Sequence, residues 1–317
     1  MPPPTPIFGA VEAGGTKFAC AVGHGPGAGI LARTQFATGS DPSRVLAQVA
    51  EWLRAQESAH GALAAIGVAS FGPVDLDERS PTHGFITTTP KPGWRGTDVL
   101  GAFRRAFPGR PVGFDTDVNG AALGEWRWGA ARDIDDFVYV TVGTGIGGGA
   151  MVRGQLVHGL VHPEMGHIPM PPIDGDAFPG ACAIHGRCWE GLCAGPAIAL
   201  RAGRPADELA ADDPAWEFTM CAMGQALATL TLVLSPRRIV VGGSVRKAGR
   251  LGEAAFFRGV RAHLREALAG YVASPALRDP GIDGFVVPPE LGDDAGVCGA
   301  FVLAEQAAGD ARITYRP

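Results

Sequence analysis

Two glycine-rich turns, each following an apolar run, constrain the fold of this 317-residue chain most strongly. One follows Val11 as Glu12-Ala-Gly-Gly-Thr-Lys17, and the other follows Val142 as Gly-Thr-Gly-Ile-Gly-Gly-Gly149. Short apolar runs bounded by glycine predict strands, and stretches of helical period lie between them. Because this order occurs twice, the sequence predicts two α/β lobes with a weakly repeated plan.

The apolar patterns also place the individual elements. Strands are predicted at residues 7–11, 18–22, 66–68, 112–114, 137–142 and 239–241. Helices are predicted at residues 43–58, 121–128, 195–202, 216–234, 253–268 and 296–308. We expect an N-terminal α/β lobe over residues 1–125, joined by the C-terminal helix within 296–317, and a larger C-terminal α/β lobe over residues 126–295.

Length and composition bound the function. A chain of 317 residues suits two domains, so a cleft between two lobes is expected. The net charge is −5 and the 27 lysines and arginines are scattered, which argues against nucleic acid and anionic membranes as partners. No apolar run approaches the ~20 residues that cross a bilayer, and residues 1–6 show no leader pattern. We therefore expect a soluble cytoplasmic protein whose six cysteines form no disulfide framework.

The first turn has the chemistry of a phosphate site. Gly14 and Gly15 leave backbone N–H groups open to close approach by phosphate, and Thr16 adds a hydroxyl donor. Glu12, beside the turn, could hold Mg²⁺ through water. The alternative is a plain hairpin whose glycines adopt positive φ.

The second turn repeats this chemistry at Gly143, Thr144 and Gly145, with more glycine than a simple hairpin requires. Two such turns predict a nucleotide held between the lobes. Neither is a Walker loop, because no Gly-Lys-Ser/Thr follows and no helix opens there, and neither is a convincing dinucleotide fingerprint. A third turn, Gly242-Gly243, could accept adenine or ribose against bare backbone, or could be a helix-capping loop.

Asp117 is the candidate general base. It lies in Asp115-Thr-Asp-Val-Asn119, which ends an apolar strand and begins a helix. Enzymes that phosphorylate hydroxyl groups need one positioned carboxylate to accept the proton, and alignment with charge neutralisation provides the rest. The alternative is a helix N-cap, which Asp115 or Asn119 could equally provide.

Four metal-ligand residues cluster in one short span. The segment His162-Pro-Glu-Met-Gly-His167 is followed by Cys182-Ala-Ile-His185-Gly-Arg-Cys188. Two nitrogen and two sulfur ligands suit tetrahedral Zn²⁺ and leave no open position for catalysis, so a structural zinc is predicted. It would staple a loop over residues 162–193 and shape the substrate pocket. The predicted ligands are His167, Cys182, His185 and Cys188.

Two carboxylates flank these ligands and belong to no helix pattern. Glu164 and Glu190 are candidates for hydrogen bonds to substrate hydroxyls. The alternative for both is an exposed carboxylate in a loop.

Taken together, these motifs resemble the ROK family of sugar kinases over residues 7 to about 305. Ser70-Phe-Gly-Pro-Val-Asp75 and Gly84 to Trp94 are similar to its zinc-containing fructokinase branch. The resemblance implies a two-lobe, actin-like (ribonuclease-H-like) α/β fold, ATP with Mg²⁺, transfer to a primary sugar hydroxyl and a homodimer. Departures are Glu12, where many members have Asp, and Thr116, where glucokinases tend to have Asn.

The resemblance also assigns roles by position. Asp117 matches the catalytic base. The nucleotide and phosphate positions are Glu12, Gly14, Gly15, Thr16, Lys17, Gly143, Thr144, Gly145, Pro196, Gly242 and Gly243. The sugar positions are Gly72, Pro73, Thr116, Asp117, Glu164, His167 and Glu190, so that His167 is claimed by both zinc and sugar.

The expected reaction is ATP-dependent phosphorylation of fructose to fructose 6-phosphate. A mannokinase, a glucokinase or a broad hexokinase stays open, because few contacts read the stereochemistry of one hydroxyl. A sugar-responsive transcriptional regulator is the alternative from another class. It is disfavoured because the first predicted strand starts at Ile7 and leaves no room for a helix-turn-helix module.

Overall fold

The computed structural model describes residues 5–309, which divide into two compact units. Among the described residues, unit 1 comprises residues 5–132, 156–162 and 293–309, and unit 2 comprises residues 133–155 and 163–292. The division falls after Arg132, and the short segment 156–162 belongs to unit 1. Residues 1–4, on which the leader expectation partly rests, and residues 310–317 of the expected C-terminal span lie outside the described part.

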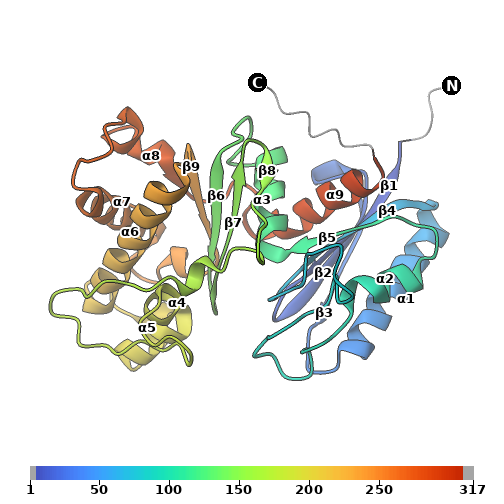
Figure 1. Ribbon diagram of the computed structural model, residues 1–317, viewed down its shortest axis with the longest axis horizontal. Helices are drawn as coiled ribbons and strands as arrows, with labels where there is room; N and C mark the ends of the chain where they lie inside the picture. The colour runs from blue at the N-terminus through green and yellow to red at the C-terminus, as the bar shows by residue number, and fades with distance from the viewer. Residues whose placement is uncertain (1–4, 310–317) are drawn as a thin grey trace. The chain divides into compact units, whose positions relative to one another are not determined.

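A five-stranded sheet forms the centre of unit 1 (Figure 1). Its antiparallel strands are β3, β2 and β1, and β4 and β5 continue from β1 in parallel. Because β1, β4 and β5 are parallel, their last residues Ala13, Ser70 and Thr116 align at one edge. The strands are β1 (Ile7–Ala13), β2 (Lys17–Gly23), β3 (Ile30–Ala37), β4 (Leu63–Ser70) and β5 (Val112–Thr116).

Helices cover both faces of this sheet. On one face α1 (Pro42–His60) lies beside α2 (Val99–Ala106), and on the other α3 (Asp117–Trp128) lies beside α9 (Ala295–Ala307). Glycines let α9 approach the strands, since a Cβ added at Gly67 would lie 1.8 Å from the Ala300 carbonyl oxygen. The sequence patterns did not predict β3, which contains no fully buried residue, or the short helix α2 of eight residues.

Unit 2 repeats the strand order of unit 1. Its sheet runs β10-β9-β6-β7-β8, with β6 and β7 antiparallel and β6, β9 and β10 parallel. The expected two α/β lobes with a repeated plan are therefore confirmed. The strands are β6 (Phe137–Val142), β7 (Ile146–Val152), β8 (Gln155–Leu156), β9 (Arg238–Gly242) and β10 (Val286–Val287). The helices are α4 (Trp189–Cys193), α5 (Gly195–Ala202), α6 (Pro214–Leu234), α7 (Glu253–Leu268) and α8 (Ile282–Phe285).

One helix corrects the expectation that no segment could cross a bilayer. By length and composition α6 is apolar enough, with a mean hydropathy of 1.4 over its best window. However, 56% of that window is buried within the protein, and α6 packs against α7 and α4. A core helix passes the same test, so α6 is weak evidence for a membrane span.

Candidate active site and metal centre

Three segments with predicted site residues leave the aligned edge of the unit 1 sheet. The turn Gly14–Lys17 follows β1, Gly72 and Pro73 come shortly after β4, and Asp117 follows β5 directly. In open α/β sheets, ligands bind beyond the carboxyl ends of parallel strands. The topology therefore assembles the predicted phosphate, sugar and base positions of unit 1 at a single edge.

The first glycine turn is held open by Thr38. Its hydroxyl donates to the Gly14 carbonyl oxygen at 2.7 Å, and its backbone N–H donates to the Thr16 oxygen at 3.0 Å. Neither Gly14 nor Gly15 adopts positive φ, so backbone conformation does not require glycine at either position. A Cβ added at Gly15 would meet no atom within 4 Å. Bare, exposed backbone at Gly15 agrees with close approach of a ligand.

Thr116, and not Asp117, caps helix α3. The Thr116 hydroxyl accepts from the Asn119 N–H at 3.1 Å, so the helix starts at Asp117, four residues before the predicted start. The N-cap alternative for Asp117 is therefore wrong, as are those for Asp115 and Asn119. Thr116 itself is buried, and capping occupies its side chain. Burial raises the pKa of Asp117 to about 6.

A buried network fixes the turn that carries Asp117. One oxygen of Asp115 accepts from the Thr116 N–H and from Asn119 Nδ2, both at 2.7 Å. The other lies 2.9 Å from Nε2 of His158, and this hydrogen bond raises the pKa of His158. His158 lies in the segment 156–162, and no sequence motif indicates its role because its partners are distant in sequence.

Glu12 lies at the end of β1 among other carboxylates. Burial, followed by the charge of Asp117, raises its pKa to about 7, whereas Lys17 lowers it. Space for its side chain exists because α9 has glycine at 296, where a Cβ would lie 2.4 Å from the Glu12 carboxyl group. Asp293 and Asp294 add further negative charge. Carboxylate oxygens are the ligands that a hard divalent cation such as Mg²⁺ prefers, and the charge near Glu12 would attract such a cation.

The segment at Gly72 and Pro73 is fixed from two sides. The peptide bond between them is cis, and the Pro73 carbonyl oxygen accepts from the Thr87 N–H at 2.7 Å and from the Thr87 hydroxyl at 3.1 Å. The next N–H, that of Val74, donates to Nε2 of His162 at 3.1 Å. The motif that contains His162 does not by itself indicate this contact.

In unit 2, three predicted nucleotide segments meet. The Gly143 carbonyl oxygen accepts from the Gly195 N–H at 2.7 Å, which places the start of α5 and the exposed Pro196 beside the second turn. A Cβ added at Gly243, which has φ of 83°, would lie 2.2 Å from the Val142 oxygen. Glycine at 243 is therefore required both by the backbone and by the space. Thr144, at the tip of the turn, is exposed.

Glu190 supports this turn from helix α4. Its Oε2 accepts from the Ile146 N–H at 2.9 Å and would be only 2.7 Å from a Cβ at Gly145. The carboxylate thus holds the backbone of the predicted phosphate turn, a contact that the sequence did not indicate. Glu164 is exposed, and its carbonyl oxygen accepts from the His167 N–H at 3.0 Å.

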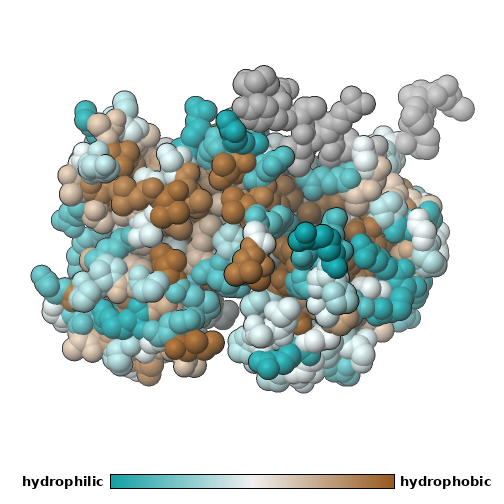
Figure 2. Space-filling model, viewed as in Figure 1, coloured by the Kyte–Doolittle hydropathy of each residue, from teal (hydrophilic) through white to brown (hydrophobic). Residues whose placement is uncertain are grey.

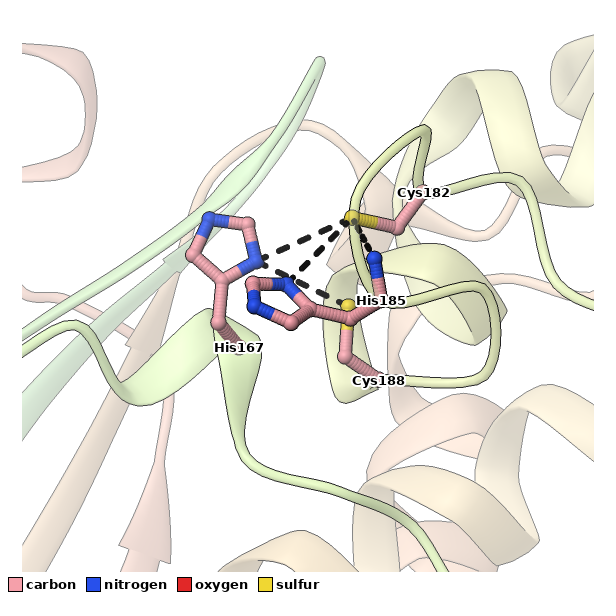
Figure 3. Close-up of side chains that lie close together, drawn as sticks. All are labelled: His167, Cys182, His185 and Cys188. Atoms are coloured by element: carbon pink, nitrogen blue, oxygen red, sulfur yellow. Dashed lines mark hydrogen bonds between the residues drawn. The ribbon is translucent and has the colours of Figure 1, made fainter. Parts of the chain in front are cut away.

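The four predicted metal ligands converge in unit 2 (Figure 3). Nδ1 of His167 lies 3.6 Å from Sγ of Cys188 and 3.9 Å from Sγ of Cys182, and Nδ1 of His185 lies 3.7 Å from Sγ of Cys182. Zinc bonds of about 2.3 Å to sulfur and 2.0 Å to nitrogen give a tetrahedral S···N edge of about 3.6 Å. The donor set therefore has the spacing of a tetrahedral zinc site.

Backbone donors complete the surroundings of both sulfur atoms. The His185 N–H points to Sγ of Cys182 and the Gly191 N–H points to Sγ of Cys188, each at 3.4 Å. Burial raises the pKa of Cys188 to about 11, so the thiolate form requires a cation. His167 is placed with the cysteines, which supports the zinc side of its two expected roles.

The fold and these sites define a protein of the ribonuclease-H-like α/β class with paired glycine turns. The chain belongs to the ROK family, which matches residues 8–307. It is 42% identical to a fructokinase of Zymomonas mobilis, covering 94% of this chain and 96% of that protein. The fructokinase of Pediococcus pentosaceus is 36% identical, covering 95% of this chain and 98% of that protein.

Solved structures agree with this assignment. A ROK hexokinase from Thermus thermophilus is similar with a TM-score of 0.76 and 28% identity, over 96% of this chain and all of that one. A ROK family glucokinase from Streptomyces griseus, solved with glucose and AMPPNP, has a TM-score of 0.71 and 25% identity over 95% and 99%.

The metal site gives a prediction about composition and stability. We expect purified protein to contain one zinc per chain, and Cys182→Ser to lose most of it and to melt at a lower temperature. Elemental analysis and thermal unfolding measure both. Cys221→Ser, at a half-buried cysteine outside the cluster, is the matched control and should keep its zinc. Stable wild type without any metal would contradict the zinc site.

The Glu190 contact gives a kinetic prediction. Glu190→Ala removes the acceptor for the Ile146 N–H and should raise KM for ATP about tenfold, because hydrogen bonds to charged groups contribute about 1.5–3 kcal/mol. Glu190→Gln keeps an acceptor oxygen and should have a smaller effect. An unchanged KM for ATP together with a raised KM for sugar would instead place Glu190 on the sugar side alone.

Proposed function

We propose that this chain transfers the γ-phosphoryl group of ATP to the primary hydroxyl of D-fructose, giving fructose 6-phosphate. The observation that carries the proposal is Asp117, a carboxylate with a raised pKa in the first turn of α3, at the same sheet edge as the first glycine turn. The choice of fructose is supported by relatives named fructokinase at 34–42% identity over most of the chain.

In the proposed reaction, the oxygen of the sugar hydroxyl bonds to the γ-phosphorus, and Asp117 accepts the proton of that hydroxyl. The bond from that phosphorus to the β,γ-bridging oxygen breaks, and ADP leaves. We assign phosphate contacts to the backbone of Gly14–Thr16 and of Gly143–Gly145. A Mg²⁺ ion near Glu12 would neutralise phosphate charge. Gly72, Pro73 and Glu164 are proposed for the sugar, and Gly242-Gly243 with Pro196 for the adenosine.

Further features of the proposal concern the metal, the compartment and the assembly. We assign a structural role to zinc at His167, Cys182, His185 and Cys188, since four protein ligands close the coordination sphere. Six free cysteines suit a reducing compartment, which supports a cytoplasmic location. The homodimer implied by the family resemblance stays a prediction.

A coupled ADP-release assay with ATP and Mg²⁺ tests the function across sugars. We expect fructose to have the highest kcat/KM, at least tenfold above mannose, glucose and N-acetylated hexosamines. We expect this preference because hydrogen bonds to specific hydroxyl groups distinguish one sugar from another strongly, whereas a hydrophobic pocket distinguishes similar substrates only weakly. Equal kcat/KM values for all these sugars would reject the specificity for fructose but not the sugar kinase activity. No ADP release above that with ATP alone, for any sugar, would reject the kinase.

Removal of the Asp117 charge should lower the catalytic activity and, at neutral pH, raise the stability of the folded protein. Asp117→Asn removes the base and should lower kcat by at least about 10²-fold. In wild type, kcat/KM should fall about tenfold per pH unit below the pKa of about 6, because the protonated carboxyl cannot accept a proton. A raised pKa means that folding stability is lost as pH rises from below 4 through about 6.

The same variant should therefore be more stable than wild type at pH 8 and equal to it below pH 4, which thermal unfolding measures. Asp98→Ala is the control, because it removes an N-cap of α2 that accepts from the Gly101 N–H at 2.7 Å. It should lower stability and leave kcat unchanged. Full activity of Asp117→Asn would overturn the assignment of the base.

A further inference from the structure

Trp94 is one of the largest side chains that unit 1 buries completely. It ends the segment whose sequence is similar to fructokinases, yet its ring has no access to solvent and cannot touch a sugar. Its Nε1–H donates to the Gly39 carbonyl oxygen at 3.0 Å. Two phenylalanines contact the ring, Phe18 at 5.6 Å and Phe71 at 5.1 Å between ring centres. Each contact leads to a different part of the site.

One side of the ring leads to the first glycine turn. Phe18 follows Lys17, the last residue of that turn, and its side chain is fully buried. Gly39 follows Thr38, which holds the Gly14 and Thr16 oxygens with two hydrogen bonds. Trp94 therefore fixes both the strand that leaves the turn and the residue that clamps it.

The other side of the ring leads to the sugar segment. Phe71 immediately precedes Gly72 and packs edge-on against Trp94 with an interplanar angle of 70°. Its N–H donates to the Ala13 carbonyl oxygen at 2.7 Å, directly before the glycine turn. Thr87, from the same segment as Trp94, holds the Pro73 oxygen.

The backbone beside Trp94 is adapted to this position. Gly93 has φ of 80°, and a Cβ there would lie 2.1 Å from the Ser40 carbonyl oxygen. Glycine lets the chain pass against residues 39–40, so that the indole reaches Gly39. Aromatic pairs add stabilisation beyond the burial of their area, which favours one fixed arrangement of the three rings.

We propose that Trp94 is a positioning residue that sets the spacing between the glycine turn Gly14–Lys17 and the sugar segment Gly72–Pro73. The inference rests on the proposed sugar kinase activity, in which the two segments hold the reacting groups. Phosphoryl transfer depends on alignment, and a displacement of about 1 Å can cost about 10²-fold in rate. Trp94 acts through Phe18, Phe71 and Gly39, and not by contact with substrate.

Trp94→Phe tests the proposal because it keeps a ring but loses the N–H and part of the volume. Its matched control is Trp216→Phe in unit 2, where Trp216 is equally buried, packs edge-on against Phe256 and has no hydrogen-bond partner for Nε1 among the described residues. Kinetics are measured at a temperature where both variants are folded, with the sugar that wild type phosphorylates best.

We expect Trp94→Phe to raise KM for both ATP and sugar about threefold to tenfold and to lower kcat about tenfold. Trp216→Phe should be less stable than wild type, with unchanged KM and kcat. Two further variants each remove one side-chain hydrogen bond and test the two segments separately. Thr38→Val should raise KM for ATP alone, and Thr87→Val should raise KM for the sugar alone. They also keep the proposal testable if Trp94→Phe does not fold.

Some outcomes would overturn the proposal. Kinetics of Trp94→Phe that match those of Trp216→Phe would make Trp94 a core residue only. In Trp94→Phe, a change in KM for one substrate alone would reject the link between the two segments. Unchanged KM values in both threonine variants would reject it as well. These outcomes are distinct from failure of the proposed function, in which wild type itself would release no ADP with any sugar.

Discussion

The approach of helix α9 to the unit 1 sheet is the contact on which the site depends. A Cβ at Gly113 of β5 would lie 2.2 Å from the Leu303 oxygen of α9, and one at Gly299 of α9 would lie 1.6 Å from the carbonyl oxygen of Gly120 in the neighbouring helix α3. Backbones can pack this closely only where side chains are absent. This packing brings α3 against β4, and Asp117 opens α3 at the edge where β1, β4 and β5 end. Gly296 of α9 leaves the space that Glu12 occupies.

Closure by α9 also explains the electrostatics. Glu12 and Asp117 are half-buried, so the ionised carboxylates lose part of their solvation and their pKa values rise to about 7 and about 6. Such a pair destabilises the folded state at neutral pH unless a cation is present. The same burial gives Asp117 a pKa close to neutral pH, which suits a general base. The same burial of Asp117 therefore lowers the stability of the folded state and raises the pKa of the general base.

The sequence predicted what is local and missed what is distant. His167, Cys182, His185 and Cys188 lie within one loop, so their spacing alone predicted a shared metal, and the geometry brings them together. Glu190 binds the N–H of Ile146 across 44 residues, and His162 binds that of Val74 across 88. No periodicity encodes such pairs. The start of α3 was misplaced because Thr116, flanked by Asp115 and Asp117, was not recognised as the cap.

The repeated topology gives a reason for the position of the candidate metal site in unit 2. In unit 1, β3 is followed almost at once by α1, whose apolar face packs on the sheet. In unit 2, the long and mostly irregular segment between β8 and α4 takes the corresponding place, and few of its residues between 169 and 187 are buried. A segment without a core needs another source of order, which four metal ligands can provide. That segment leads into α4, whose Glu190 holds the backbone of the second glycine turn. The candidate metal site and the predicted phosphate site are thereby connected through a few residues of one short helix.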